Sequence, residues 1–353
     1  MLQDRPIGDN RTPVGPGGHI LGMTTPENMV RLGISDTEDL VALAPYLLGY
    51  QPSERLVFMV LQRGRLVVTG ALSLEAVREP AEFADAIGQA IEQHSDPLVL
   101  FACWSHDEEL AQEALSMAEL SVGPDRVLDS VAIGEHRWRS RSGHGRGGDV
   151  AELENSPAVA QAVVAGLVRA PSREAVVEVV QGPSGELLAQ LRELHADARE
   201  TVLERGPGTT LPRARGLQKT LLEQGRRTPG LLAELSVHAG MPQVRDELWL
   251  QITTRNAQRH LELWSAVVAQ SPPEHAEGPL LMMAFASWLS GEGTLLVACL
   301  ERAHHLGASG WQIDALDQIN RHAVNPRTWG QGRAGEVFGA PPPRSARRAA
   351  RAG

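Results

Sequence analysis

The chain has 353 residues, of which 42% are hydrophobic and 22% charged, and its formal net charge is −10. This length is enough for two domains with separate cores. No apolar run approaches the ~20 residues of a membrane-spanning helix, and the acidic balance argues against non-specific nucleic-acid binding by the body of the protein. The Gly/Pro-rich stretch from Met1 to Gly18 lacks the apolar core of a secretory signal, so a cytoplasmic location is expected.

Cysteine and lysine usage adds two expectations. Cys103 and Cys299 lie in apolar stretches without CxxC spacing, which predicts buried thiols rather than a disulfide or a metal pair. Lys219 is the only lysine among 33 basic residues. Such a preference for arginine is typical of the codon bias of an actinobacterial source, and it weakens any arginine cluster as a sign of phosphate recognition.

The first third of the chain alternates between strand and helix patterns. Residues 1–33 contain Gly and Pro without apolar periodicity, which predicts a flexible N-terminal segment. A short helix is expected next, capped by Ser35 or Asp36 and ending at Gly49. The elements expected after it are a hairpin of strands over 55–61 and 65–74, a helix over 80–94 and a buried strand over 98–103.

A capping signal precedes the next helix. Ser105 followed by Glu108 matches a capping box, which predicts Ser105 as the N-cap of a helix ending near Gly123. The run 106–109 also has metal-ligand residue types, but its place at a helix start favours capping. With a further strand over 126–133, the alternation predicts an α/β domain over residues 34–139, with a small sheet and covering helices.

The character of the chain changes after this point. Residues 140–157 read as a Gly/Arg-rich linker, with a phosphate-binding loop over 140–149 as the alternative. Helical patterns broken by Pro and Gly predict an all-α domain over 158–330. Residues 331–353 are expected to form a disordered basic tail, in which the residues able to contact nucleic acid are Arg344, Arg347, Arg348 and Arg351.

Known catalytic and cofactor motifs are absent from the sequence. There is no GxxxxGK[ST] loop, no GxGxxG after a strand, no GxSxG elbow and no HExxH. Neither a cofactor nor a metal is therefore expected. The segment from Ser236 to Gly240 loosely imitates a helix-turn-helix, but the acidic Asp246 and Glu247 that follow argue against DNA reading.

Two distant blocks of sequence carry a resemblance to a known family. The first runs from Thr37 through Gly49-Tyr50-Gln51-Pro52 to Val60, and the second contains Val244-Arg245-Asp246 and the stretch 284–303. Together they resemble an actinobacterial family, the domain of unknown function 4192, over most of the chain. The resemblance implies no particular activity.

The chain departs from this family where residues suited to acid/base, nucleophilic or metal chemistry are expected. Relatives carry a Ser at the position of Arg55 and an Arg-x-Asp-Leu-Pro pattern at 71–75. They also carry a Tyr and cysteines after the Arg-Trp-Arg-Ser motif, which stands here at 137–140. These departures favour a member without enzymatic activity.

The polar residues shared with the family gather in the second half of the sequence. The candidate ligand-binding residues are Arg245, Asp246, Trp288, Glu292 and Arg302. They could form an Arg–carboxylate network between helices, or a ligand pocket with Trp288 as a stacking wall. In the first half, Tyr50 and Pro52 form an aromatic turn that is either packed or an exposed contact.

Three functions remain open at this point. The first is a non-enzymatic cytoplasmic interaction or regulatory protein of an actinobacterium or its mobile elements, with an unidentified protein partner and with or without self-association. The second is an enzyme or small-ligand-binding protein with a site in the interdomain cleft, built from Asp39, Arg245, Asp246 and Glu292. The third is nucleic-acid binding through the basic tail.

Overall fold

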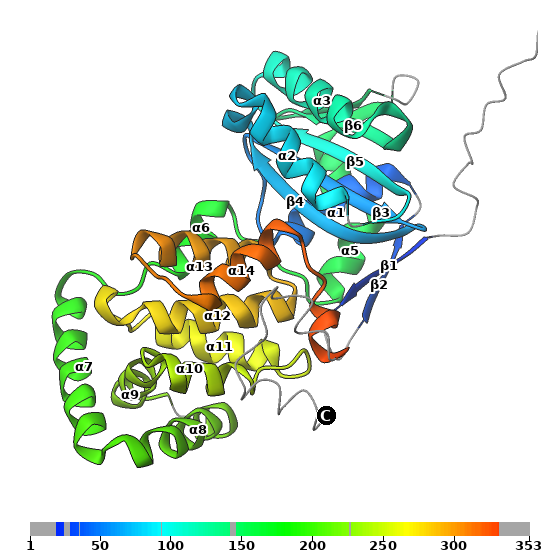
Figure 1. Cartoon of the computed structure of the whole chain (residues 1–353). Helices are drawn as coiled ribbons and strands as arrows, with labels where there is room; N and C mark the ends of the chain where they lie inside the picture. The colour runs from blue at the N-terminus through cyan, green and yellow to red at the C-terminus, as the bar shows by residue number, and fades with distance from the viewer. Residues whose placement is uncertain are drawn as a thin grey trace, which may run out of the picture.

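The computed structural model describes residues 19–24, 29–34, 36–92, 94–141, 146–225 and 227–331. A mixed sheet with covering helices is followed by a region built almost entirely of helices, as the sequence predicted (Figure 1). We call residues 36–172 the sheet unit and residues 173–331 the helical unit. The domain boundaries expected from the sequence stay a prediction.

The sheet has six strands in the order β4-β3-β5-β6-β7-β8. Strands β5 and β6 are parallel, and every other neighbouring pair is antiparallel. The strands are β3 (Arg55–Gln62), β4 (Arg65–Ser73), β5 (Pro97–Trp104), β6 (Val127–Ile133), β7 (Arg137–Ser140) and β8 (Gly147–Asp149).

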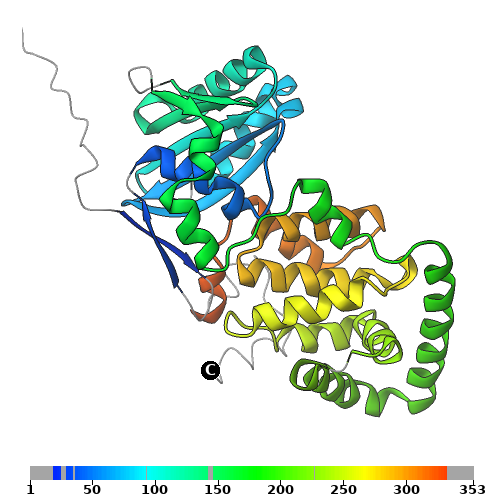
Figure 2. The same ribbon diagram turned by 180° about the vertical axis from the view of Figure 1, so that it is seen from behind.

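Helices cover both faces of this sheet. Leu56 and Phe58 of β3 pack with α2 (Pro80–Ile91) and α3 (Glu108–Val122), while Val57 between them faces the other side. That other side is covered by α1 (Thr37–Leu48), α4 (Val150–Glu154) and α5 (Pro157–Val164), which come to the front in Figure 2. Alternate residues of a strand point to opposite faces, so the apolar run of a central strand fills two cores. Two 3₁₀ turns, Leu74–Arg78 and Pro124–Arg126, complete the connections.

The N-terminal segment contains structure that the sequence did not predict. Strands β1 (His19–Thr24) and β2 (Met29–Ile34) pair antiparallel as a separate two-stranded sheet. Strand β2 lies against α5 and α1, and β1 lies against β4. Residues 19–24 and 29–34 thus form strands where no regular structure was predicted, and residues 1–18 lie outside the described residues. The flexibility of this segment stays a prediction.

The predicted linker over 140–157 also differs from the structure. It holds the end of β7, the edge strand β8 and helix α4, whose Leu153 is part of the sheet core. Gly147 has a structural reason: a Cβ there would lie 2.7 Å from the carbonyl oxygen of Trp138 on β7. Glycine at this position permits close approach of two strands, which composition alone cannot distinguish from flexibility. Residues 142–145 lie outside the described residues.

The cap of α3 lies two residues beyond the predicted position. The N-cap is Asp107, whose Oδ1 accepts from the backbone N–H groups of Glu109 and Leu110 at 2.9 and 3.1 Å. Ser105 instead donates its hydroxyl to Glu54 at 2.9 Å and accepts from the N–H of Asp107 at 3.0 Å. A carboxylate competes well for helix-start amides, so Asp107 takes the role that Ser105 was expected to play.

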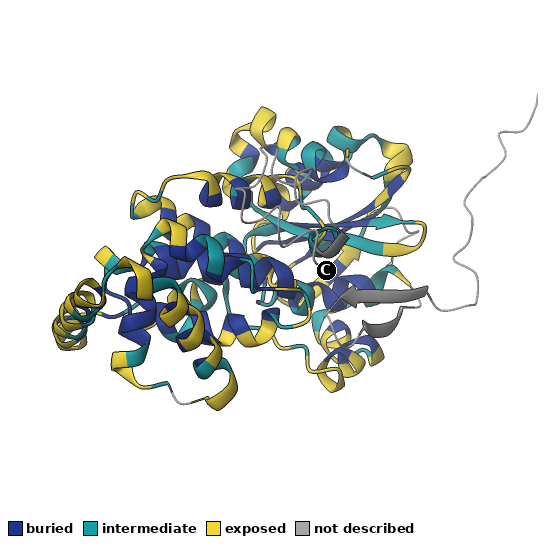
Figure 3. Ribbon diagram, turned by 60° about the horizontal axis from the view of Figure 1, so that its bottom comes forward, coloured by how far each residue is buried: buried dark blue, intermediate teal, exposed yellow. Residues whose placement is uncertain are grey.

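The helical unit surrounds one central helix. Its helices are α6 (Arg173–Val179), α7 (Gly185–Arg205), α8 (Pro207–Gln224), α9 (Pro229–Ala239), α10 (Pro242–Trp249), α11 (Ala257–Val268), α12 (Glu277–Ser290), α13 (Gly293–His305) and α14 (Trp311–Arg321), with 3₁₀ turns at Pro273–His275 and Pro326–Gln331. Every residue of α12 from Gly278 to Ser290 is buried, and the centre of this unit is accordingly dark blue in Figure 3.

No helix among the described ranges is both long and apolar enough to cross a lipid bilayer. Cys103 and Cys299 are both buried, as predicted. The expected tail contacts Arg344, Arg347, Arg348 and Arg351 lie outside the described residues.

The close approach of α12 to α9 yields a test of this packing. A Cβ on Gly278 would lie 2.2 Å from the carbonyl oxygen of Ala239, and backbone atoms cannot move away as a side chain can. We expect Gly278→Ala to destabilise the protein by about 2–4 kcal/mol in denaturant unfolding. In Gly88→Ala of α2 the new Cβ meets nothing within 4 Å. That control should be neutral or stabilising by up to about 1 kcal/mol, and equal effects of the two changes would contradict the packing.

Candidate functional site

Arg245 and Asp246, at the centre of the second sequence block, belong to one buried network. The Nε of Arg245 donates to Gln312 Oε1 at 2.9 Å, and Gln312 Nε2 donates to Asp246 Oδ1 at 2.9 Å. Arg245 also donates to the carbonyl oxygen of Ala239 at 3.3 Å and lies 3.4 Å from the carboxylate of Glu277. These contacts tie α10, α12 and α14 together.

Burial dominates the electrostatics of this network. Arg245 is 4% exposed, and its burial lowers the pKa of the guanidinium against the attraction of Glu277 and Asp246. Burial likewise raises the pKa of Asp246, although a hydrogen bond from Trp311 and the charge of Arg245 oppose the rise. Gln312 joins the two charged groups and satisfies both, which explains how they are tolerated in the core.

Trp288 is part of the aromatic core. It is 4% exposed, and its indole N–H donates to the carbonyl oxygen of Val324 at 2.7 Å. Its ring packs against Phe285 and Trp329, with centroids 5.7 and 6.4 Å away. The ring that was a candidate stacking wall therefore contacts the protein's own aromatic side chains.

Arg302 lies on α13 and contacts the turn after α6. One of its terminal nitrogens donates to Gln181 Oε1 at 3.1 Å, and burial lowers the pKa of the guanidinium. Gly182 has φ +74°, and a Cβ on it would lie 3.3 Å from another terminal nitrogen of Arg302. Arg302 thus holds the turn after α6.

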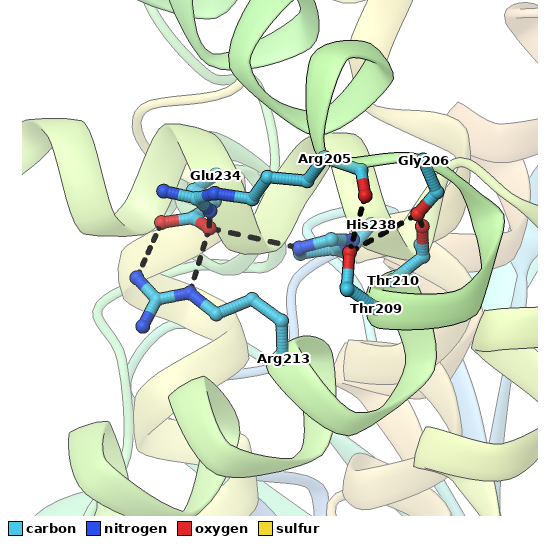
Figure 4. Close-up of polar contacts among 7 residues, drawn as sticks. All are labelled: Arg205, Gly206, Thr209, Thr210, Arg213, Glu234 and His238. Carbon is cyan, nitrogen blue, oxygen red and sulfur yellow. Dashed lines mark hydrogen bonds and ion pairs between the residues drawn. The ribbon is translucent and has the colours of Figure 1, made fainter.

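A further polar cluster, which the sequence did not indicate, lies between α7, α8 and α9 (Figure 4). Glu234 is 7% exposed and accepts from Arg213 at 2.9 and 2.8 Å and from Arg205. The hydrogen bond from Arg213 is the main reason why the pKa of Glu234 is lowered. His238 lies 3.8 Å from Glu234, beyond hydrogen-bond distance, and burial lowers the pKa of its imidazole. Since both arginines share one carboxylate, we interpret this cluster as a clamp between helices.

The first sequence block meets the second at the junction between the two units. Thr294, at the start of α13, donates its hydroxyl to the carbonyl oxygen of Leu48 at 2.7 Å. Arg173 of α6 donates to both oxygens of Glu301 at 2.5 and 2.7 Å. The segment after α5 stabilises the turn after α1 through two backbone hydrogen bonds. The Ala170 N–H donates to the carbonyl oxygen of Gly49 at 2.8 Å, and the Gln51 N–H donates to the carbonyl oxygen of Ala170 at 3.0 Å.

Tyr50 anchors this turn from inside. It is 3% exposed and belongs to the core under α1, so the turn is packed and its ring is not an exposed contact. Burial is the main reason why the pKa of its phenol is raised, and the nearby Arg55 and Arg173 partly oppose the rise. Beside it, Arg169 donates to Gln51 and lies over the ring of Tyr46, 5.3 Å from the centroid.

Glu292 is the one sequence candidate at this junction. It lies between α12 and α13, and a Cβ on Gly49 would be 3.7 Å from its Oε2. Both Gly49 (φ +79°) and Gly291 (φ +83°) adopt the left-handed conformation that favours glycine. No other described residue forms a hydrogen bond or ion pair with the Glu292 carboxylate.

The environment of Glu292 is unusual for a surface carboxylate. The residue as a whole is exposed, yet burial raises the pKa of its carboxyl, and burial is the sole cause. The exposure of the residue and the burial effect on its pKa are compatible if protein atoms lie near the carboxylate while part of the side chain is open to water. A carboxylate with a raised pKa and no partner among the described residues is a candidate for an incoming hydrogen-bond donor or cation.

The remaining candidates of the cleft hypothesis do not converge on Glu292. Arg245 contacts Glu277 at the first residue of α12, whereas Glu292 follows the last, so about 20 Å of helix axis separates them. Asp39 lies in the first turn of α1, and Glu292 lies beyond the last turn of that helix, at Gly49. The structure brings Arg245 and Asp246 together and leaves Asp39 and Glu292 apart.

The comparison with protein families fits this geometry. Residues 38–307 match the model of the domain of unknown function DUF4192. The chain belongs to this family. The DUF4192 match begins inside α1 and ends just after α13, so it contains Gly49, Glu292 and both halves of the junction. Gln312, which completes the Arg245 network, lies outside it. Neither the curated proteins nor the solved structures contain a match.

Sequence reasoning identified Glu292 but not the residues that surround it. Neither Ala170, the backbone partner of the turn after α1, nor the pair Arg173–Glu301 that ties α6 to α13 had a recognisable motif. The sequence signals for this contact were the glycines next to Glu292 and the Gly49-Tyr50 turn. Positive φ values at Gly49 and Gly291 let the two loops approach each other.

The buried network predicts an unequal cost for two arginine substitutions. Arg245→Met leaves Gln312 Oε1, the Ala239 carbonyl and the carboxylate of Glu277 without their cationic partner, and we expect a loss of about 3 kcal/mol in denaturant unfolding. Arg139 is 69% exposed and pairs with Glu108 at 3.4 Å on the surface. Arg139→Met should change stability by less than about 0.5 kcal/mol, and a comparable loss in both variants would contradict a buried clamp.

Proposed function

We propose that this protein acts by binding a partner rather than by catalysing a reaction, and that Glu292 receives a basic group of that partner. The observation that carries the proposal is the Glu292 carboxylate, which lies at the junction of the two units, has no partner among the described residues and has a pKa raised by the surrounding protein. An arginine or lysine side chain supplies both the charge and the hydrogen bonds that this carboxylate lacks.

The surroundings of Glu292 favour binding over catalysis. General acid–base chemistry needs a second group matched to the first, and no charged neighbour among the described residues contributes to the pKa of Glu292. The positions at which the family carries residues suited to such chemistry hold other residues in this chain. The proposal therefore keeps the expectation of a non-enzymatic, cytoplasmic regulatory protein of an actinobacterium with a protein partner.

The geometry of the junction also favours a specific partner. The Thr294–Leu48 hydrogen bond joins the two units two residues after Glu292, and Arg173–Glu301 ties α6 to α13 within the helical unit. A rigid support of this kind reduces the entropy lost when a side chain binds. A partner that contacts both units adds surface to the single charged contact.

The pKa of Glu292 leads to a test of its environment. A raised pKa means that the folded protein binds this proton more tightly than the unfolded chain does. Wild-type stability should therefore fall as pH rises from about 4.3, the ordinary glutamate value, through the raised folded pKa. Glu292→Gln should increase Tm at pH 7 by up to about 2 °C and should match the wild type near pH 4.

Glu301→Gln is the control for this measurement, because Glu301 is paired with Arg173 and its removal should not raise Tm. A lower Tm for Glu292→Gln at pH 7 would show that the carboxylate has a stabilising partner and would contradict its unpaired state.

Binding of a basic group can be tested with defined peptides. A short arginine-rich peptide should bind in calorimetry at low ionic strength, and its citrulline counterpart, which has the same shape without the charge, should not. Glu292→Gln should weaken binding about tenfold. Glu186→Gln in the exposed first turn of α7 removes the same charge elsewhere and should change binding less than about twofold.

Equal affinity of the wild type and Glu292→Gln would refute the role of Glu292. A partner captured from host lysate supports the proposal only if Glu292→Gln loses it and Glu186→Gln retains it. A measured turnover abolished by a single polar substitution would replace the binding function with an enzymatic one.

A further inference from the structure

The helical unit contains a cavity that no sequence motif indicated. It has a volume of about 340 Å³ and lies between α8 and the start of α11. The residues of its wall that matter here are Arg215, Lys219, Glu223, Asn256, Arg259 and His260. This volume lies at the lower end of the range for small-molecule sites, about 300–1,000 Å³.

The wall of this cavity is positively charged within an acidic protein. It contains Arg215, which is paired with Glu247 outside the wall, together with Arg259 and the only lysine of the chain, Lys219, against the single acid of the wall, Glu223. Lys219 lies 3.8 Å from Glu223 in an exposed pair, which holds it weakly. Arg259 donates to the carbonyl oxygen of Leu222 at 2.6 Å, and no carboxylate among the described residues pairs with it.

The start of α11 adds backbone donors to this wall. Asn256 occupies the N-cap position, but its Oδ1 accepts from the N–H and the hydroxyl of Thr253 at 2.7 and 3.1 Å. No side chain therefore caps α11. The first N–H groups of a helix have no partner within it, and together with the helix dipole they attract anions.

His260 is the buried polar group of the cavity wall. It is 1% exposed, and its Nδ1 has no hydrogen-bond partner among the described residues. Burial is the main reason why the pKa of its imidazole falls to about 4, with a smaller effect of Arg259, so the ring is neutral near pH 7. The ring lines the cavity, but its Nδ1 is shielded from solvent, so a ligand in the cavity would meet the imidazole through its other atoms.

We infer that this cavity binds a small molecule through a phosphate group. Arg259 and Lys219 supply cationic donors from α11 and α8, and the uncapped start of α11 supplies backbone N–H groups beside the buried ring of His260. Several donors that converge from different elements suit an anion with several oxygens. This site is independent of the proposed function, because Glu292 is not part of the cavity wall.

Inorganic phosphate and pyrophosphate are the probes for this site, titrated by calorimetry at low ionic strength. Arg259→Gln should weaken pyrophosphate binding about tenfold or more, and Arg259→Lys should retain most of the affinity because it keeps the charge. Arg321, an exposed residue in the last turn of α14, gives the matched control. Arg321→Gln should change the affinity less than about twofold.

A second variant separates binding from folding. Gln258 is exposed in the first turn of α11, and Gln258→Glu places a negative charge where the helix dipole favours it. Tm should stay equal or rise, while pyrophosphate affinity should fall severalfold through repulsion. An NMR titration of the full-length wild type should shift the His260 imidazole resonances.

Failure of the wild type to bind either probe up to about 10 mM would overturn the inference. Equal binding by the wild type and Arg259→Gln, or unchanged His260 resonances on saturation, would also overturn it. An oligonucleotide that bound in a manner dependent on Arg259 while both small probes did not would replace the small molecule with nucleic acid. None of these outcomes affects the test of Glu292.

Discussion

Helix α12 has apolar or small residues on every side between Gly278 and Ser290, and its burial constrains the arrangement of the whole helical unit. A helix of this kind must be enclosed by other helices, because no face of it is compatible with water. Gly278 brings its first turn against the backbone of Ala239. Arg245 forms an ion pair with Glu277 at the same end of α12. At the other end the helix is followed by Gly291 and then Glu292. The position of Glu292 is thus a consequence of how α12 is enclosed.

The charged and polar groups of this protein fall into two classes, those with partners inside the chain and those without. Glu234 is buried between two arginines, and the buried Arg245 is satisfied by Gln312, Glu277 and a backbone carbonyl. Each of these clusters is complete within the chain and ties helices together. Glu292 and His260 differ, because among the described residues neither the Glu292 carboxylate nor the buried Nδ1 of His260 has a hydrogen-bond partner. Desolvation without compensation costs stability, so such groups are better candidates for binding than the paired clusters are.

The two proposed sites carry opposite charge and lie on different elements. Glu292 offers one carboxylate at the junction of the sheet unit and the helical unit. The cavity between α8 and α11 offers arginine, lysine and backbone N–H donors inside the helical unit alone. A basic group of a protein partner and a small phosphate-bearing molecule therefore do not compete for the same contacts. The first site follows from the retained family blocks, and the second has no counterpart in any motif of the sequence.

The sequence by itself determined the order of strands and helices from α1 to β6, the family and the candidate Glu292, because periodicity, turn residues and short motifs are local properties. It misjudged Gly147, since a glycine that permits close strand packing and one that permits flexibility have the same composition. The sequence likewise predicted Ser105 as the N-cap of α3, but the Ser105 hydroxyl donates to Glu54, which lies far away in the chain. Only the tertiary structure decided that Arg245 and Asp246 are joined through Gln312 and that Glu292 faces Gly49. It also decided that an uncapped helix start lies beside Lys219 and Arg259. These are contacts between distant segments, and their energies depend on burial and distance, which no local pattern contains.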